Sequence, residues 1–277
     1  MNESVKITIL CEDQARMGFR DKIFLAQHGF SVFIEADRKI LFDTGAGDVF
    51  ARNAALAGID LAETDCIVLS HGHWDHSDGL AALAETPVPA CPLLLHPGVF
   101  VDRHKANGEY NGIGWRREQI AARFDLVESA TPYRIAEGIH FLGQIPREND
   151  FEGQATAFYV VNNHEKFPDF ILDDSALAIG SPEGLVIVSG CSHAGICNIV
   201  EHARRVTGQD RVHTVLGGFH LLGNPGQLEQ TIAYFKTNRV EHLYPMHCTD
   251  LPALARFHQE FGIRKLCAGD AVEIGGR

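Results

Sequence analysis

The apolar positions of the first seventy residues predict three strands, a helix and then a buried strand. Residues 5–10, 23–36 and 39–45 are rich in β-branched and aromatic side chains, which favour extended structure. Residues 47–59 place their apolar side chains at helical spacing instead. The short run at 65–70 (DCIVLS) is almost wholly apolar, and this pattern is typical of a strand covered on both faces.

The next segments predict a helix at 78–86 and another buried strand at 92–97. Residues 102–117 (DRHKANGEYNGIGWRR) are polar and rich in glycine. This composition predicts a long surface loop, and loops of this kind often cover a functional site.

The second half of the chain is arranged like the first. Strands come first, and helices then alternate with strands. Strands are expected at 133–145 and 155–161, followed by two strands around a turn at 176–190. Beyond them, helices and strands are expected to alternate, with helices at 196–206, 226–237 and 251–261 and strands at 211–218, 240–247 and 263–269. The pattern predicts an α/β (α+β) fold of two mixed sheets packed face to face, with helices outside. No linker separates the halves, so we expect a single domain over residues 1–277.

Composition narrows the class of protein further. The chain has 277 residues, 45% of them hydrophobic, and a formal net charge of −12. This negative charge repels the phosphate backbone of nucleic acids, so we expect no nucleic acid to bind. The first ten residues lack the features of a secretory signal, and no apolar run reaches the roughly 18 residues of a membrane helix. We therefore expect a cytoplasmic protein with no membrane partner.

The seven cysteines are an odd, scattered set without a C-x-x-C pair, so neither a disulfide framework nor a zinc ribbon is expected. The segment SHGHWDHSDGL at 70–80 carries the clearest chemistry. His71 and His73 are two residues apart, so an extended backbone points both toward one ion. Asp75 and His76 follow where the chain turns into a helix and can reach a second ion. These donors suit zinc and are compatible with manganese or iron; the alternative is a polar loop that only solvates a helix start.

One loop supplies four ligands at most, so the remaining ligands must come from other strand ends. His193 and His247 each follow an apolar strand and are candidate metal ligands, although a structural role is the alternative for both. Cys191 is either a thiolate ligand or a small core residue. His220 either contacts substrate or is placed only by close packing at the glycines before it. Asp43 is expected to accept a hydrogen bond from a ligand imidazole and to fix its tautomer.

A competing interpretation concerns the segment GCSHAG at 190–195. It nearly matches the nucleophile elbow G-x-S-x-G, with Ser192 as the nucleophile. A serine hydrolase would also need Asp210 or Asp250 together with His247. This interpretation leaves the histidine cluster at 71–76 unexplained, whereas a metal site explains both segments.

The H-x-H-x-D-H pattern formed by His71, His73, Asp75 and His76 resembles the signature of the metallo-β-lactamase fold superfamily. The motifs FDTG, SHGHWDHSDGL, IPR, DDSAL, GCSHAG, GGFHL and HCTD occur in an order that resembles one subgroup. Its members are named 7,8-dihydropterin-6-yl-methyl-4-(β-D-ribofuranosyl)aminobenzene-5′-phosphate synthase-like hydrolases. The resemblance spans residues 5–270 and implies a four-layer αβ/βα sandwich with metals at one end of the two sheets.

The chain departs from the superfamily pattern at two ligands. The superfamily usually has a further histidine in mid-chain, but residues 143–150 contain none. It also has a bridging aspartate after a later strand, where this chain has Cys191. We expect His193 to replace one missing ligand, and the bridge to be Asp75, Cys191 or solvent.

The sequence therefore predicts a metal-dependent hydrolase that cleaves an ester or phosphoester in a small metabolite. It is expected to bind two divalent metal ions, with zinc as the first choice. Between two such ions the pKa of a bridging water falls toward about 7. Asp75 would both ligate a metal and orient the attacking water, and His220 is a second catalytic candidate. His28, Arg147 and His220 are candidates for binding an anionic group of the substrate.

Two alternatives belong to other classes of protein. One is an oxidoreductase of the same fold with a single iron, and the other is a ligand-binding protein of low turnover. A flavin-dependent di-iron enzyme is disfavoured, because that branch has Glu where this chain has His73 and carries an added flavodoxin domain. A homodimer is compatible with the sequence.

Overall fold

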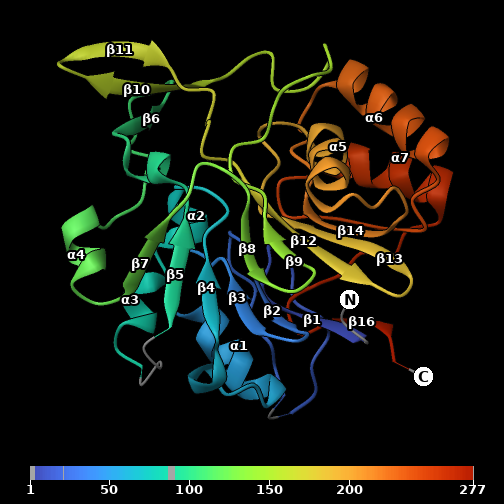
Figure 1. Ribbon diagram of the computed structural model, residues 1–277, viewed down its shortest axis with the longest axis horizontal. Helices are drawn as coiled ribbons and strands as arrows, with labels where there is room; N and C mark the ends of the chain where they lie inside the picture. The colour runs from blue at the N-terminus through green and yellow to red at the C-terminus, as the bar shows by residue number, and fades with distance from the viewer. Residues whose placement is uncertain (1–3, 21, 87–90, 277) are drawn as a thin grey trace.

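A computed structural model describes residues 4–20, 22–86 and 91–276. Within these ranges, two large β-sheets face one another and helices lie outside both (Figure 1). A smaller three-stranded sheet projects from one end of the molecule. The structure thus confirms the α/β class with two large mixed sheets and adds the small sheet to it.

The first sheet has seven strands and combines antiparallel with parallel pairing. Its strand order is β16 (Ala271–Gly275), β1 (Ser4–Cys11), β2 (Ser31–Glu35), β3 (Lys39–Phe42), β4 (Cys66–Val68), β5 (Pro92–Leu95) and β7 (Asp125–Glu128). Strands β16 to β3 pair antiparallel, and β3, β4, β5 and β7 pair parallel. The parallel strands therefore release their following loops at a common edge, where a site can form.

The second sheet has six strands. Their order is β15 (His242–Met246), β14 (Val212–Gly218), β13 (Gly184–Ser189), β12 (Ala176–Ser181), β9 (Ile139–Phe141) and β8 (Tyr133–Ala136). The strands β13, β14 and β15 are parallel. The loops after β13 and β15 contain predicted metal ligands, and the loop after β14 contains His220, a predicted substrate contact.

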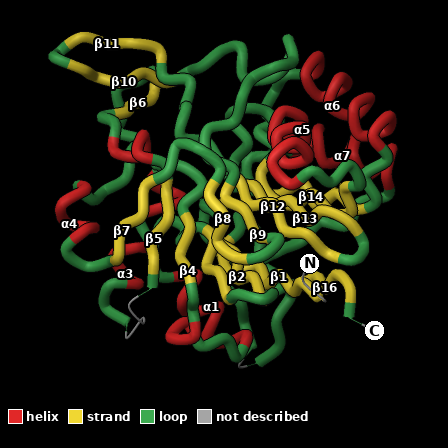
Figure 2. Tube along the Cα trace, viewed as in Figure 1, coloured by secondary structure: helices red, strands yellow, loops and turns green. Residues whose placement is uncertain are grey.

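The helices divide between the two sheets (Figures 1 and 2). Beside the first sheet lie α1 (Val49–Ala57), α2 (Trp74–Ser77), α3 (Leu80–Leu83) and α4 (Arg117–Ala121), with the 3-10 helices η1 (Leu61–Glu63) and η2 (Pro97–Phe100). Beside the second sheet lie α5 (Ile196–Thr207), α6 (Pro225–Asn238) and α7 (Leu251–Phe261). None of the helices in the described ranges is long and apolar enough to cross a membrane.

Three apolar cores hold these layers together. The central core packs side chains of both sheets against each other, among them Phe42 and Leu177. A second core lies between the six-stranded sheet and its helices and includes Phe219, Phe235 and Phe257, whose rings contact one another. A third core lies between the seven-stranded sheet and α1. The molecule thus has four layers, two sheets between two layers of helices, as the resemblance to the superfamily implied.

Several predicted elements differ from the structure. The strand expected at 23–36 is confined to Ser31–Glu35, because Asn53 bonds both the N–H (3.0 Å) and the carbonyl (2.8 Å) of Leu25 and so replaces a strand partner. The helix expected at 78–86 is confined to α3 at Leu80–Leu83, and a separate short helix, α2, precedes it at Trp74–Ser77. No strand forms at 263–269; Cys267 N–H instead donates to the Asp270 carboxylate, and β16 follows that turn.

The surface loop expected at 102–117 was only partly correct. Its start is β6 (Arg103–Lys105), which pairs with β10 (Phe158–Asn162), and β10 pairs with β11 (Glu165–Pro168) to form the small sheet. Arg103 is 1% exposed, since its guanidinium pairs with Asp169 and Asp173. Because Arg103 is a charged residue in a polar segment, its burial could not be predicted from the local pattern.

Candidate metal centre

The histidine-rich loop begins where β4 leaves the seven-stranded sheet. Gly72 lies against η2, and a Cβ atom at this position would come within 2.4 Å of the Val99 carbonyl oxygen. The Gly72 N–H donates to Asp173 Oδ2 at 2.8 Å, and Arg103 holds the same carboxylate. Only glycine fits this approach, and the loop that carries His71 and His73 is therefore fixed from both sides.

The first group of candidate ligands consists of three imidazoles. His71 Nε2 lies 2.9 Å from His73 Nδ1, and His193 Nε2 lies 3.2 Å from the same atom. His71 and His73 come from the loop after β4, whereas His193 comes from the loop after β13. The structure thus brings together three of the predicted ligands across the two sheets, with all three at most 9% exposed.

The second group consists of Asp75, His76 and His247. His76 Nε2 lies 3.2 Å from His247 Nε2, and Asp75 Oδ2 lies 3.3 Å from His247 Nε2 and 3.8 Å from His76 Nε2. His76 lies on the short helix α2, and His247 follows β15. All three side chains are buried.

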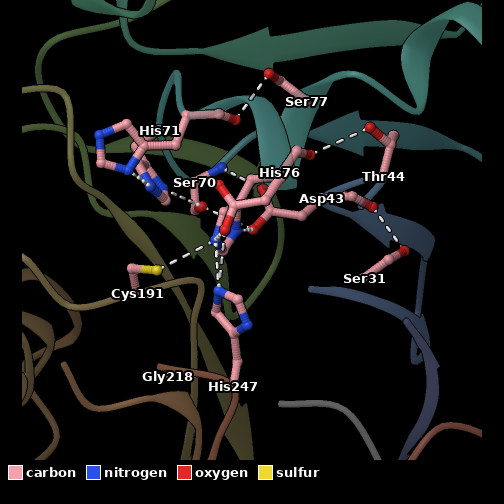
Figure 3. Close-up of polar contacts among 12 residues, drawn as sticks. Ser31, Asp43, Thr44, Ser70, His71, His76, Ser77, Cys191, Gly218 and His247 are labelled. Carbon is pink, nitrogen blue, oxygen red and sulfur yellow. Dashed lines mark hydrogen bonds and ion pairs between the residues drawn. The ribbon is translucent and has the colours of Figure 1, made fainter. Parts of the chain in front are cut away.

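Cys191 lies within reach of both groups, and Figure 3 shows its thiol directed toward His76. Its Sγ is 3.1 Å from His76 Nε2. It also falls within 4.8 Å of the ligand atoms of His71 and His193 on one side and of His76 and His247 on the other. A thiolate here reaches both groups, at the position where the superfamily pattern has its bridging aspartate.

The Asp43 carboxylate sets the tautomers of two ligand imidazoles (Figure 3). His76 Nδ1 donates to Asp43 Oδ2 at 2.7 Å. Ser70 Oγ also donates to this oxygen at 2.7 Å and lies 2.9 Å from His71 Nδ1. A hydroxyl has one hydrogen, so His71 Nδ1 is the donor in that last contact. Nε2 of both histidines is therefore free to ligate, as expected for Asp43.

The charges in this cluster fit a cation. Burial, together with the neighbouring imidazoles, holds the pKa values of His71, His73 and His193 well below their usual range. These rings are consequently neutral, and one hydrogen cannot satisfy both contacts that His73 Nδ1 makes, with His71 Nε2 and with His193 Nε2. At least one of these buried nitrogens therefore lacks a hydrogen-bond partner in the cluster. Buried lone pairs that face one another repel unless a positive charge lies between them. The imidazole, carboxylate and thiolate donors suit a divalent metal, and zinc in particular.

The rim of the second group contains Asp13, which was not anticipated from the sequence. Asp13 Oδ1 lies 3.1 Å from His28 Nδ1 and 3.4 Å from His247 Nδ1, and His28 Nε2 lies 3.3 Å from Asp75 Oδ2. Burial raises the pKa of Asp13, but the hydrogen bonds from His247 and His28 outweigh it and hold this pKa well below the usual range. The only available signal was an acidic pair, residues 12–13, at the end of a strand. His28 was predicted to bind substrate and lies at this rim, with its side chain 60% exposed.

A cavity of about 410 Å³ opens beside His193 and His220. Aromatic rings form part of its wall, and amides and a hydroxyl form another part. No Lys, Arg, Asp or Glu side chain contributes to the described lining. The residues that characterise the wall are Phe151, Phe158, Phe170, Thr156, Asn224 and Gln227.

Arg147 lies behind this wall. Its guanidinium donates to the carbonyls of Phe170 and Ile171, and its Nε would meet a Cβ at Gly153 at 2.7 Å. Phe170, Ile171 and Gly153 all line the cavity. The geometry thus gives Arg147 a role in supporting the wall, while its predicted contact with an anionic substrate group stays a prediction.

The structure does not assemble a serine-hydrolase triad around Ser192. Its hydroxyl donates to the Gly218 carbonyl oxygen at 2.5 Å, and the side chain is buried. Asp250 caps α7 through Ala253 N–H rather than orienting His247. These contacts do not support the interpretation of GCSHAG as a nucleophile elbow, and the segment instead brings Cys191 and His193 to the candidate metal centre.

The sequence profile of the metallo-β-lactamase superfamily matches residues 26–142 of this chain. An uncharacterized protein of Methanocaldococcus jannaschii is 35% identical over 86% of this chain and 90% of its own length. The chain therefore belongs to the metallo-β-lactamase superfamily, as the H-x-H-x-D-H motif indicated.

Two further comparisons are more specific. A second protein of Methanocaldococcus jannaschii, named 7,8-dihydropterin-6-methyl-4-(β-D-ribofuranosyl)-aminobenzene-5′-phosphate synthase, is 32% identical over 98% of this chain and 97% of its own length. The crystal structure of a metal-dependent hydrolase of the β-lactamase superfamily is 30% identical, has a TM-score of 0.83 and covers 98% of this chain and 100% of its own. These comparisons confirm the fold and the resemblance to the dihydropterin subgroup.

Proposed function

We propose that this protein is a divalent-metal-dependent hydrolase that cleaves an ester or phosphoester in a small metabolite. The observation that carries the proposal is the pair of buried ligand groups on either side of Cys191. The crystal structure of a metal-dependent hydrolase with a TM-score of 0.83 supports it.

His71, His73 and His193 would hold one ion, and Asp75, His76 and His247 a second, with Cys191 between them. When bound, two such ions supply Lewis acidity toward a carbonyl or phosphoryl oxygen and lower the pKa of a water. Zinc suits this donor set best, and manganese or iron is compatible with the histidines and the carboxylate.

Asp75 is suited to hold and orient the attacking water. Burial raises its pKa, but His76 and His247 outweigh this effect and hold the pKa of Asp75 well below the usual range. The side chain is therefore a carboxylate that accepts hydrogen bonds throughout the neutral pH range. His28 contacts Asp75 from the exposed rim, so we assign it to substrate contact there.

The cavity beside His193 and His220 is the proposed binding site for the remainder of the substrate. Phenylalanine rings favour a flat apolar group, and Asn224 and Gln227 offer amide donors and acceptors at its edge. Because no charged side chain is part of the described lining, the anionic part of a phosphoester would lie toward the metal ligands, with Arg147 behind the wall.

The test loads the purified protein with zinc or manganese and assays carboxylic esters, thioesters, phosphomonoesters and phosphodiesters. The double variant His73→Ala, Asp75→Ala removes one ligand from each group, and His164→Ala, an exposed histidine, serves as the control. We expect the double variant to lose bound metal and to be slower by about 100-fold or more. Full activity in the metal-free double variant would sink the proposal.

A second candidate function, transfer of a group to an amine, is favoured by the full-length relative that is named a synthase. A metal centre that stabilises a departing anion can serve this reaction as well as hydrolysis, because only the nucleophile differs. The discriminating assay offers a phosphorylated 6-hydroxymethyl-dihydropterin with and without an aminobenzene compound. A coupled product formed only with the amine supports transfer, whereas the free alcohol in both reactions supports hydrolysis.

A further inference from the structure

Cys248 and His220 adjoin the metal centre but belong to neither of its two ligand groups. His220 follows β14, and Cys248 follows β15 directly after the ligand His247. One ring nitrogen of His220, Cys191 Sγ and Cys248 Sγ lie within 4.8 Å of one another. Cys248 Sγ also lies 3.3 Å from the carbonyl oxygen of Cys191. Three metal-ligating side chains from three separate strand ends therefore converge beside the centre.

The backbone is shaped to accommodate the Cys248 thiol. A Cβ atom at Gly218 would come within 2.5 Å of Cys248 Sγ and 3.2 Å of Cys191 Cα, so no larger residue fits there. His220 and His247 both have positive φ values, 48° and 43°. Such backbone conformations are unfavourable for non-glycine residues and are concentrated at functional sites. Gly218 thus leaves room for the Cys248 thiol as well as for the Gly190 carbonyl oxygen, whereas Gly217 allows close packing against the Ser189 backbone.

His220 also has unused ligating capacity. Its Nδ1 is buried and has no hydrogen-bond partner within the described part of the chain. Its ring lies 4.2 Å, centroid to centroid, from that of His193, and both rings line the cavity. A metal held by His220 would therefore face the space in which a substrate binds.

We propose that Cys191, His220 and Cys248 form a third metal position, which takes zinc or another thiophilic divalent ion and shares the Cys191 thiolate with the neighbouring ions. Two cysteines and one histidine are a known ligand set for zinc, and they leave a fourth coordination position open. This site goes beyond the proposed hydrolase centre, which uses neither Cys248 nor His220 as a ligand. The open position would give the enzyme an additional point of attachment for an anionic or sulfur-bearing substrate group.

The first experiment measures zinc bound per chain after reduction with a phosphine and equilibrium dialysis. It compares the wild type with Cys248→Ser and His220→Ala, and uses Cys66→Ala, a buried cysteine in the core between the sheets, as the control. We expect the wild type and Cys66→Ala to bind one ion more than either site variant. With cobalt in place of zinc, Cys248→Ser should show weaker thiolate-to-metal charge-transfer absorption than the wild type, because the Cys191 thiolate remains as a ligand. Equal binding and equal spectra in all four proteins would overturn the proposal.

The second experiment needs no variant that might misfold. Cys248 and Cys267 are both partly exposed, but Cys267 lies outside the cluster. Zinc should slow the alkylation of Cys248 by iodoacetamide at least tenfold, a chelator should restore it, and the rate at Cys267 should not change. Alkylation of Cys248 that is indifferent to zinc contradicts the site. Neither experiment reads out turnover, so their outcome is separate from that of the hydrolase assay.

Discussion

The Asp43 carboxylate determines which nitrogen of two imidazoles faces the metal centre. It contacts His76 directly and His71 through Ser70, and it is completely buried. Asp43 itself has a positive φ of 56°, so its side chain is directed by a backbone conformation that few residues adopt. Mutation of such a supporting residue lowers metal affinity by about 10–100-fold.

Asp43→Ala should therefore weaken zinc binding by about 10–100-fold, because His71 and His76 lose the partner that fixes their tautomer. The measurement is a competition against a chromophoric chelator at pH 7.5. Asp48→Ala is the matched control, since the Asp48 side chain is half-exposed and pairs with Arg52 on the surface. Equal zinc affinity in the two variants would show that the hydrogen bonds of Asp43 do not support the site.

The protonation of Asp174, whose carboxyl group accepts a hydrogen bond from Ala194 N–H beside His193, makes the stability of the fold depend on pH. Burial raises its pKa to about 7, although the Ala194 N–H and Arg147 act in the opposite direction. The folded chain therefore keeps this proton up to about pH 7, whereas the unfolded chain releases it near pH 4. Because the folded state binds more protons in that window, the contribution of Asp174 to stability is complete below pH 4 and is lost as the pH rises through 7.

Asp174→Asn should remove this loss, since the amide keeps an acceptor for Ala194 N–H and carries no charge. In urea unfolding of the metal-free protein, the variant should gain about 2–4 kcal/mol relative to the wild type on going from pH 4 to pH 8. A difference between the two proteins that does not change with pH would contradict a buried, protonated Asp174.

At the scale of elements, helix α5 is the support of the second half of the site. Its first residues follow His193, and Gly195 at its N-cap has a φ of 102° and no capping side chain. Glu152 takes over this role from a distant loop, with its carboxylate accepting from Cys197 N–H and Asn198 N–H at 3.1 Å each. The carboxylate thus satisfies two N–H groups that a helix start leaves free.

Glu152→Ala should destabilise the protein by about 2–4 kcal/mol, because two buried N–H groups lose their acceptor. Chemical denaturation measures the free energy of unfolding, and Glu118→Ala, an exposed residue of α4, should change it by less than about 0.5 kcal/mol. A similar small change in Glu152→Ala would mean that water or another group caps α5.

Across the whole molecule, the local sequence pattern predicted the sheets and much of the centre, but not the contacts between distant segments. The buried strands β4, β5, β12 and β13 are short apolar runs, and the spacing of His71 and His73 is a local feature. Strand β11 was missed because all four residues of its EKFP sequence lie on the surface and one of them is proline. Asp13 lies 234 residues from His247 in sequence, and no local pattern relates the two.

Two further residues that bear on the centre without being predicted as ligands, Arg103 and Cys248, show the same limit. Arg103 binds the carboxylate that anchors Gly72, and it comes from a polar segment that resembled a loop. Cys248 is placed by the absence of a side chain at Gly218, on a neighbouring strand. The role of Cys248 depends on packing between β14 and β15, and that of Arg103 on the contact of β6 with Asp173 beside the metal loop, and only the folded chain defines these contacts.

Two metal ions are expected to bind on either side of Cys191, and anomalous X-ray diffraction of zinc-loaded crystals tests this arrangement most directly. Data collected above and below the zinc absorption edge should show one peak among His71, His73 and His193 and a second among Asp75, His76 and His247. The absence of a peak from either group, or zinc bound only elsewhere on the chain, would contradict the account.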